Sequence, residues 1–204
     1  MLDDHALLTA WQGGDERAGR TLVERHYDAV ARFFATKDRA HAADLLQLTF
    51  VKLIEARARI PGDCNVRAYA LGIARHVLLD HFRAMYRSGP QIDFEARSVA
   101  DLQPTPSSVL AREQQTRLIL LGLRRIPLES QILLELYYWE DLKAREIVEL
   151  LGVPEGTIRT RLRRARQLLE AALAELADSP ELLQSTVSDL EAWARRAREE
   201  LRPG

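Results

Sequence analysis

The stretch that decides the fold runs from Lys143 to Arg166 and reads KAREIVELLGVPEGTIRTRLRRAR. Two short helical patterns flank Gly152, a residue type that often ends a helix because it tolerates positive φ. Pro154 follows, and proline suits the first turn of a helix, where its missing N–H costs nothing. The stretch therefore predicts a helical hairpin with an arginine-rich second helix, which is a common way to place a protein on DNA.

The second helix of this hairpin should have one buried face and one exposed face. Its predicted buried stripe consists of Ile158, Leu162, Ala165, Leu168 and Leu169. Its predicted DNA-facing residues are Thr157, Arg159, Thr160, Arg163 and Arg164. Arginine can fork to guanine or to phosphate, and threonine reaches phosphate or the thymine methyl group. We expect Arg161 and Arg166 to hold the DNA backbone or a neighbouring acid.

Arginine-rich helix faces also occur as plain solvated surface, with each charge paired four residues along the helix. Here no acidic residue lies between Glu155 and Glu170, so the arginines would repel one another without an anionic ligand. The whole chain has 29 basic and 30 acidic residues and a net charge of −1. Attraction to DNA must therefore come from this local patch and not from the total charge.

The composition is that of a globular protein. The chain has 204 residues, of which 47% are hydrophobic and 29% charged, enough to build real cores. Its start shows no signal peptide, and no apolar run approaches the length of about eighteen residues that a membrane span needs. We therefore predict a cytoplasmic protein without a membrane span.

The cysteine and histidine content restricts the chemistry. A single cysteine, Cys64, excludes an intrachain disulfide and a cysteine zinc site. Cys64 itself is either a redox-sensing thiol or a plain small residue, and the second interpretation is favoured. His76 and His81 are five residues apart and lack an acidic cluster in the sequence, so we predict no metal site and no cofactor.

Helical periodicity runs along most of the chain, so the predicted fold class is all-α. Four helices are expected before residue 87, and glycine, proline and serine then mark a linker. We predict two helical domains joined by a flexible linker, followed by a helical tail. The predicted bounds are 1–87 for the first domain, 88–112 for the linker, 113–177 for the second domain and 178–204 for the tail.

Three segments together resemble one family. LGVPEGTIRTRLRRAR (151–166) closely resembles the region 4 helix-turn-helix of extracytoplasmic-function (ECF) sigma factors, within the sigma-70 family of bacterial RNA polymerase. AADLLQLTFVKLIEAR (42–57) resembles the region 2 helix that docks on the polymerase clamp. VRAYALGIARHVLLDHFR (66–83) resembles the region 2 helix beside the promoter-melting loop. The match covers roughly residues 5–177, although Leu48 departs from the acid that the family usually has after Gln47.

The resemblance implies a non-catalytic subunit that directs promoter-specific initiation. The helix after Pro154 would recognise the −35 element through the DNA-facing residues named above. The residues implied to bind core polymerase are Asp44, Gln47, Thr49 and Phe50. The residues implied to recognise and melt the −10 element are Ile60, Gly62, Asp63, Cys64, Asn65, Arg75, His76 and Arg83. Base capture by the loop is physically reasonable, because unstacking a base costs a few kcal/mol that pocket contacts offset.

The implied partners are bacterial core RNA polymerase, through its β′ clamp and β flap, and promoter DNA. Whether an anti-sigma factor or the C-terminal tail controls the protein stays open. The main alternative is a stand-alone helix-turn-helix regulator, but the first half lacks βα alternation and a phospho-acceptor strand. A helical enzyme would need a polar motif such as Glu-x-x-His or a phosphate-binding glycine-rich loop, and the sequence has neither.

Overall fold

The computed structural model describes residues 3–86, 92–103, 114–188 and 192, and across them the fold is all-α as predicted. The helices are α1 (Asp4–Gln12), α2 (Glu16–Ala35), α3 (Ala42–Ala56), α4 (Val66–Met85), α5 (Val99–Leu102), α6 (Gln114–Arg125), α7 (Leu128–Leu134), α8 (Ala144–Leu151), α9 (Glu155–Leu176) and α10 (Pro180–Ser188). A 3-10 turn at Arg57–Arg59 follows α3, and a π-helical turn at Glu135–Trp139 follows α7. The rest of the predicted tail lies outside the described residues.

Polar side chains cap the free N–H groups at the start of α1, α2 and α4. Asp3 accepts a hydrogen bond from the N–H of Ala6 at 2.8 Å and so begins α1. Asp15 does the same for the first turn of α2, and the Asn65 side chain accepts from the N–H of Ala68 at the start of α4. Such caps are worth about 1 kcal/mol each, and they fix where each helix enters the bundle.

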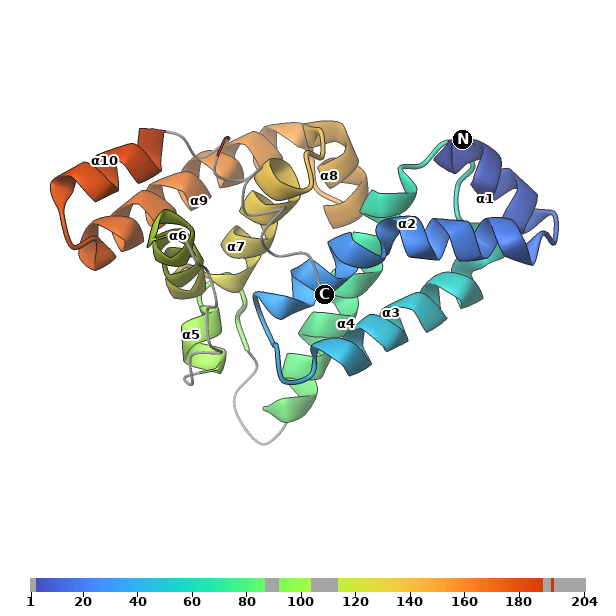
Figure 1. Ribbon diagram of the computed structural model, residues 1–204, viewed down its shortest axis with the longest axis horizontal. Coiled ribbons are helices and arrows are strands. Elements are labelled where there is room, and N and C mark those ends of the chain that lie inside the picture. The colour runs from blue at the N-terminus through green and yellow to red at the C-terminus, as the bar shows by residue number, and fades with distance from the viewer. Residues whose placement is uncertain (1–2, 87–91, 104–113, 189–191, 193–204) are drawn as a thin grey trace.

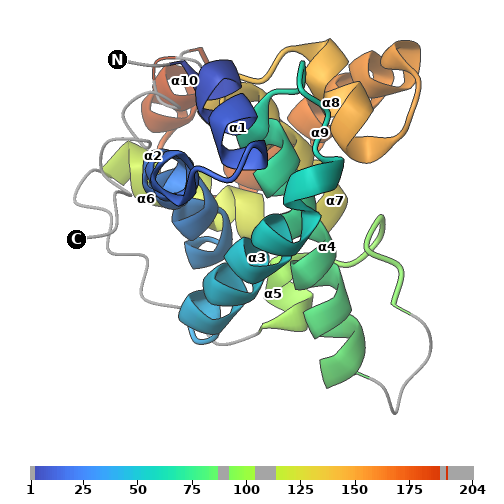
Figure 2. The ribbon, with the colours of Figure 1, turned by 90° about the vertical axis from the view of Figure 1, so that its right-hand side faces the viewer.

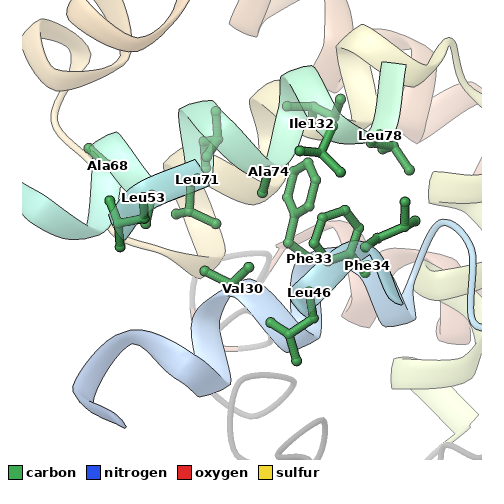
Figure 3. Packing of buried hydrophobic residues seen from close by; sticks show 14 of the residues in the cluster. Val30, Phe33, Phe34, Leu46, Leu53, Ala68, Leu71, Ala74, Leu78 and Ile132 are labelled. Carbon is green, nitrogen blue, oxygen red and sulfur yellow. The ribbon is translucent and has the colours of Figure 1, made fainter. Parts of the chain in front are cut away.

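The N-terminal half, α1–α4, has a tightly packed apolar core (Figure 3). Phe33 and Phe34 of α2 extend toward Leu78 and Ala74 of α4 and meet edge to face, with ring centroids 5.3 Å apart. At the other end of α2, Gly19 lies against Trp11, and a Cβ atom there would be 2.3 Å from the indole nitrogen. Glycine is therefore required for α1 and α2 to approach this closely.

The C-terminal half, α6–α10, encloses a second core between α6 and α9. Gly122 of α6 lies under α9, where a Cβ atom would be 2.8 Å from a methyl group of Leu173. The short helix α10 covers one end of this core and contacts both α6 and α9. In Figure 1 these helices lie on the left, and the N-terminal half lies on the right.

The two halves are in contact, and one apolar core continues across their boundary. Ile132 of α7 reaches Phe33 and Leu78 of the N-terminal half (Figure 3). Ile147 of α8 and Ile158 of α9 belong to the same cluster, and α8 packs against α4. Figure 2 shows α1, α2 and α3 nearest the viewer, with α4 between them and α7. We call this face-to-face arrangement of the two halves the closed arrangement.

Residues 92–103, from the middle of the predicted linker, are also packed. Phe94 is buried beside Phe82 of α4, at a ring distance of 6.5 Å. On the other side, the N–H of Leu128 donates to the carbonyl of Arg97 at 2.8 Å. This segment therefore contacts both halves, which corrects the expectation of a flexible connection along its whole length. The predicted linker residues on either side lie outside the described chain.

Candidate nucleic-acid interface

The hairpin forms as the sequence predicts, with Gly152 at its corner. Gly152 has φ 67° and ψ 30°, the left-handed conformation that lets the chain leave α8. Ile147 and Ile158 are completely buried and hold the two helices together. At the start of α8 the N–H of Lys143 donates to the carboxylate of Glu146 at 2.7 Å, which supports the helix without a serine or threonine cap.

Three of the five arginines on α9 are paired with acids. The pairs are Arg159 with Glu155 at 2.6 Å, Arg161 with Glu95 at 3.1 Å and Arg166 with Glu170 at 2.9 Å. The expectation that Arg161 and Arg166 hold a neighbouring acid is confirmed. The solvated-surface interpretation therefore fits Arg159 and Arg166, whose partners lie four residues along the same helix.

The remaining two arginines differ from these. Arg163 and Arg164 are exposed, and no acid within the described residues lies at salt-bridge distance from either guanidinium. Each presents a planar fork of donors that matches phosphate or the guanine edge. These two charges form the part of α9 that an anionic ligand is best suited to neutralise.

The two threonines contribute less hydrogen bonding than expected. The hydroxyl of Thr160 donates to the carbonyl of Gly156 within the helix at 3.0 Å, so its proton is already used. Its exposed methyl group remains available for an apolar contact. Thr157 is half-buried at the start of α9.

The predicted −10 loop contains residues of opposite exposure. Gly62 and Asp63 are exposed, whereas Ile60 is only 3% exposed and packs into the N-terminal core. This corrects the expectation that Ile60 faces a base. Asn65 is half-buried, and its amide donates to Glu146 of α8 at 2.8 Å. In the closed arrangement the end of the loop is therefore held by the other half of the molecule.

A cavity of about 340 Å³ lies between this loop and α8. Asp63 lines it from the loop, and Glu146 and Glu149 line it from α8. Cys64 also lines it, and burial raises the pKa of its thiol to about 11, with the neighbouring carboxylates adding to the shift. A thiol with this pKa stays protonated at neutral pH, which disfavours the redox-sensing interpretation. The acidic lining also repels a nucleotide phosphate while the halves are closed.

Two of the α4 residues expected to line the path of the opened strand already have acidic partners. Arg75 is held by both carboxylate oxygens of Glu129 on α7, at 3.0 and 2.5 Å. Arg83 pairs with Asp80 at 2.8 Å, and His76 is exposed. Arg75 thus binds a carboxylate of the C-terminal half in place of the phosphate expected from the sequence.

The predicted polymerase-binding residues on α3 divide into two pairs. Asp44 and Gln47 are exposed, as expected. Thr49 is fully buried, with its hydroxyl donating to the carbonyl of Leu45, and Phe50 is 7% exposed and stacked on Tyr27. Both side chains face the core, which corrects the expectation that Thr49 and Phe50 contact a partner directly.

An exposed apolar strip takes their place on the outer face of α3. Leu48, Val51 and Ile54 are 44%, 43% and 53% exposed, although their type is normally buried. This strip was not expected from the sequence, because the periodic pattern alone does not distinguish its residues from the core residues of the same helix. The sequence did contain a signal for this strip, because α3 has apolar residues on more than one face. A single buried face needs only three to four apolar residues in two turns.

Comparison with known proteins agrees with this geometry. The sigma-70 region 2 family description matches residues 22–87, and the sigma-70 region 4 description matches residues 116–169. The ECF RNA polymerase sigma-E factor of Haemophilus influenzae is 24% identical over 86% of this chain and 98% of its own. The RNA polymerase sigma-H factor of Pseudomonas aeruginosa is 25% identical over 85% of this chain and 95% of its own.

A solved structure shares the fold. CnrH, determined in complex with the cytosolic domain of CnrY, has a TM-score of 0.60 and 23% identity to this chain. The similarity covers 86% of this chain and 99% of that one. Within the part of the chain that the structure describes, no helix is both long and apolar enough to cross a membrane.

The fold and the hairpin define a helix-turn-helix protein that binds DNA. The two family matches, in this order along one chain, are more specific. The chain belongs to the ECF sigma factors of the sigma-70 family, which direct promoter-specific transcription by RNA polymerase.

Proposed function

We propose that the chain divides promoter recognition between its two halves, with the bounds 1–87 and 113–177 predicted from the sequence. Helix α9 would bind the −35 element through Arg163 and Arg164, with Arg159, Thr157 and Thr160 at its edge. The observation that carries this assignment is the pair of exposed arginines that have no acidic partner among the described residues. In the N-terminal half, the loop 60–65 and α4 would recognise and melt the −10 element.

Removing one of these arginines should weaken −35 recognition selectively. We expect Arg163→Ala to cost about 1–3 kcal/mol in binding the preferred −35 sequence if its guanidinium contacts a base. The measurement is promoter affinity of the polymerase complex on templates that differ only in that element. Arg125→Ala is the matched control, because Arg125 is an exposed arginine paired with Glu175 on the far side of the same half. An unchanged −35 preference in Arg163→Ala would remove that residue from base recognition.

The exposed strip on α3 is the proposed docking surface for the β′ clamp of core polymerase. Leu48, Val51 and Ile54 would supply apolar contact, and Asp44 and Gln47 the polar edge. Apolar residues with partial exposure, rimmed by polar groups, are typical of protein–protein interfaces. In this proposal Thr49 and Phe50 support the strip from beneath.

A charge placed in the strip should weaken polymerase binding. We expect Leu48→Asp to lower affinity for core polymerase by on the order of tenfold or more, because a central apolar contact becomes a buried charge. Fluorescence titration with core enzyme measures the loss, and a circular dichroism melt checks the fold. Tyr137→Ser, at an exposed aromatic in the C-terminal half, serves as the control. If both variants bind core equally well, the strip is not the docking surface.

We further propose that the closed arrangement is the form of the free protein and that polymerase binding separates the halves. Glu129 and Glu146 occupy Arg75 and Asn65, two residues that the −10 strand would contact. Carboxylates and phosphates compete for such groups because both are anions with paired oxygens. The protein would act in the cytoplasm and would have no catalytic activity of its own. An anti-sigma factor or the C-terminal tail would control its activity. The β flap of core polymerase would contact the C-terminal half.

Reconstituted transcription tests this function. The full chain added to core polymerase should yield transcripts from a defined subset of a randomised promoter pool. Enriched sequences would reveal separate −35 and −10 elements. If the chain binds promoter DNA tightly by itself and never supports initiation with core, it is a stand-alone regulator.

A further inference from the structure

The N-terminal half contains a cluster of one carboxylate and two imidazoles that no promoter or polymerase contact uses. Asp38 follows α2, His41 immediately precedes α3, and His81 lies near the end of α4. Their candidate ligand atoms lie within 4.8 Å of one another. The prediction of no metal site rested on His76 and His81 alone. The fold instead brings His81 to His41, forty residues earlier in the chain.

Asp38 is the centre of this cluster. Its side chain is completely buried, and its Oδ2 lies 2.9 Å from Nδ1 of His41 and 2.8 Å from Nε2 of His81. The two imidazole rings are 4.8 Å apart. A buried carboxylate is costly unless it is paired, and within the described residues no lysine or arginine is at salt-bridge distance from it. Lys37, the preceding residue in the chain, contacts Glu135 instead.

The donor set matches a divalent transition-metal ion. Two imidazole nitrogens and one carboxylate oxygen are common ligands of zinc, with water in the fourth position. Tetrahedral zinc with bonds of about 2.1 Å separates its ligands by about 3.4 Å. The two nitrogen-to-oxygen distances, 2.9 and 2.8 Å, are shorter than this, and all three ligand atoms lie within 4.8 Å of one another. Rotations of the side chains would therefore be needed to admit the ion. His41 is 45% exposed, which leaves a path from solvent.

We propose that Asp38, His41 and His81 form a binding site for a divalent transition-metal ion of the zinc class. The three ligands come from the segment after α2, the residue before α3 and the last turns of α4. A bound ion would therefore join the three helices of the N-terminal half at one end. It would also replace two hydrogen bonds by stronger coordination and neutralise the buried carboxylate. This inference does not depend on the proposed promoter contacts.

Metal titration of the full chain tests the site without polymerase. After treatment with a chelator, the protein should bind one equivalent of Zn²⁺ by calorimetry, and its melting temperature should rise with the Zn²⁺ concentration. Cobalt substitution should give the visible absorption of a tetrahedral nitrogen–oxygen site. We expect His41→Gln and His81→Gln to weaken binding at least about tenfold, since each removes one of three protein ligands. His76→Gln changes another α4 histidine and should bind like the original chain.

His41→Gln is the informative variant if His81→Gln fails to fold, because His41 is half exposed. Absence of stoichiometric binding to the original chain would overturn the proposal. Equal affinity in His41→Gln and His76→Gln would overturn it as well. An intense sulfur-to-cobalt absorption band would place the ion at Cys64 and would also contradict the proposed site.

Discussion

Replacing Lys37 with methionine should shift the protein from its closed arrangement toward an open one by about 3–5 kcal/mol, because the change leaves a buried carboxylate without its cation. Lys37 lies just beyond the end of α2 and is completely buried, and its ammonium contacts Glu135 of the C-terminal half. It also donates to the carbonyl of Phe33 at 2.9 Å. Burial lowers the pKa of Lys37 and raises that of Glu135, while their mutual attraction opposes both shifts.

X-ray scattering of the free protein measures this opening as an increase in the radius of gyration. The double variant Lys37→Met with Glu135→Met should close again, because an apolar pair of similar volume replaces the ion pair. Arg125→Met breaks the exposed pair with Glu175 and should change compactness very little. A Lys37→Met protein as compact as the original would show that this ion pair does not hold the halves together.

Shortening Phe50 to alanine should destabilise the N-terminal half by about 3–5 kcal/mol, the usual cost of removing a buried phenylalanine ring. Phe50 is 7% exposed and stacks on Tyr27, with ring centroids 6.2 Å apart. Urea unfolding of the free protein measures the loss as a lower midpoint. Phe50→Leu, which retains most of the apolar volume, should lose considerably less.

The Phe50 result also separates stability from docking. Weak polymerase binding by Phe50→Ala would reflect unfolding, whereas Leu48→Asp should weaken binding in a folded protein. A Phe50→Ala protein with an unchanged unfolding midpoint would place this ring on the surface and would restore the expectation of direct contact.

The hairpin could be predicted because its signals are local. Gly152 at the corner and the spacing of Ile158, Ala165 and Leu169 depend only on neighbours in the chain, and all appear in the structure as expected. The inward orientation of Thr49 and Phe50 was missed because a periodic pattern shows that a helix has faces but not which face meets the core.

Contacts between distant segments could not be predicted from one sequence. Glu129 reaches Arg75 across 54 positions, and the Asp38–His81 contact spans 43. Each depends on the order in which helices pack, which local periodicity does not specify. The docking of residues 92–103 was missed for the same reason, since their acids and the prolines that flank them, Pro90 and Pro104, resemble those of an unpacked linker.

The bidentate contact between Arg75 and Glu129 has a thermodynamic consequence. In the closed arrangement Arg75 contacts a carboxylate, and in the open arrangement it would contact promoter DNA. The equilibrium between the two arrangements is therefore linked to DNA binding. If only about 1% of free molecules are open, the apparent affinity for promoter DNA falls about a hundredfold, without any change at the DNA surface itself. By reciprocity, a ligand that favours the open state raises the affinity for promoter DNA by the same factor by which promoter DNA raises the affinity for that ligand. The strength of this ion pair, together with the other contacts between the halves, would thus influence how much polymerase is needed before promoters are occupied.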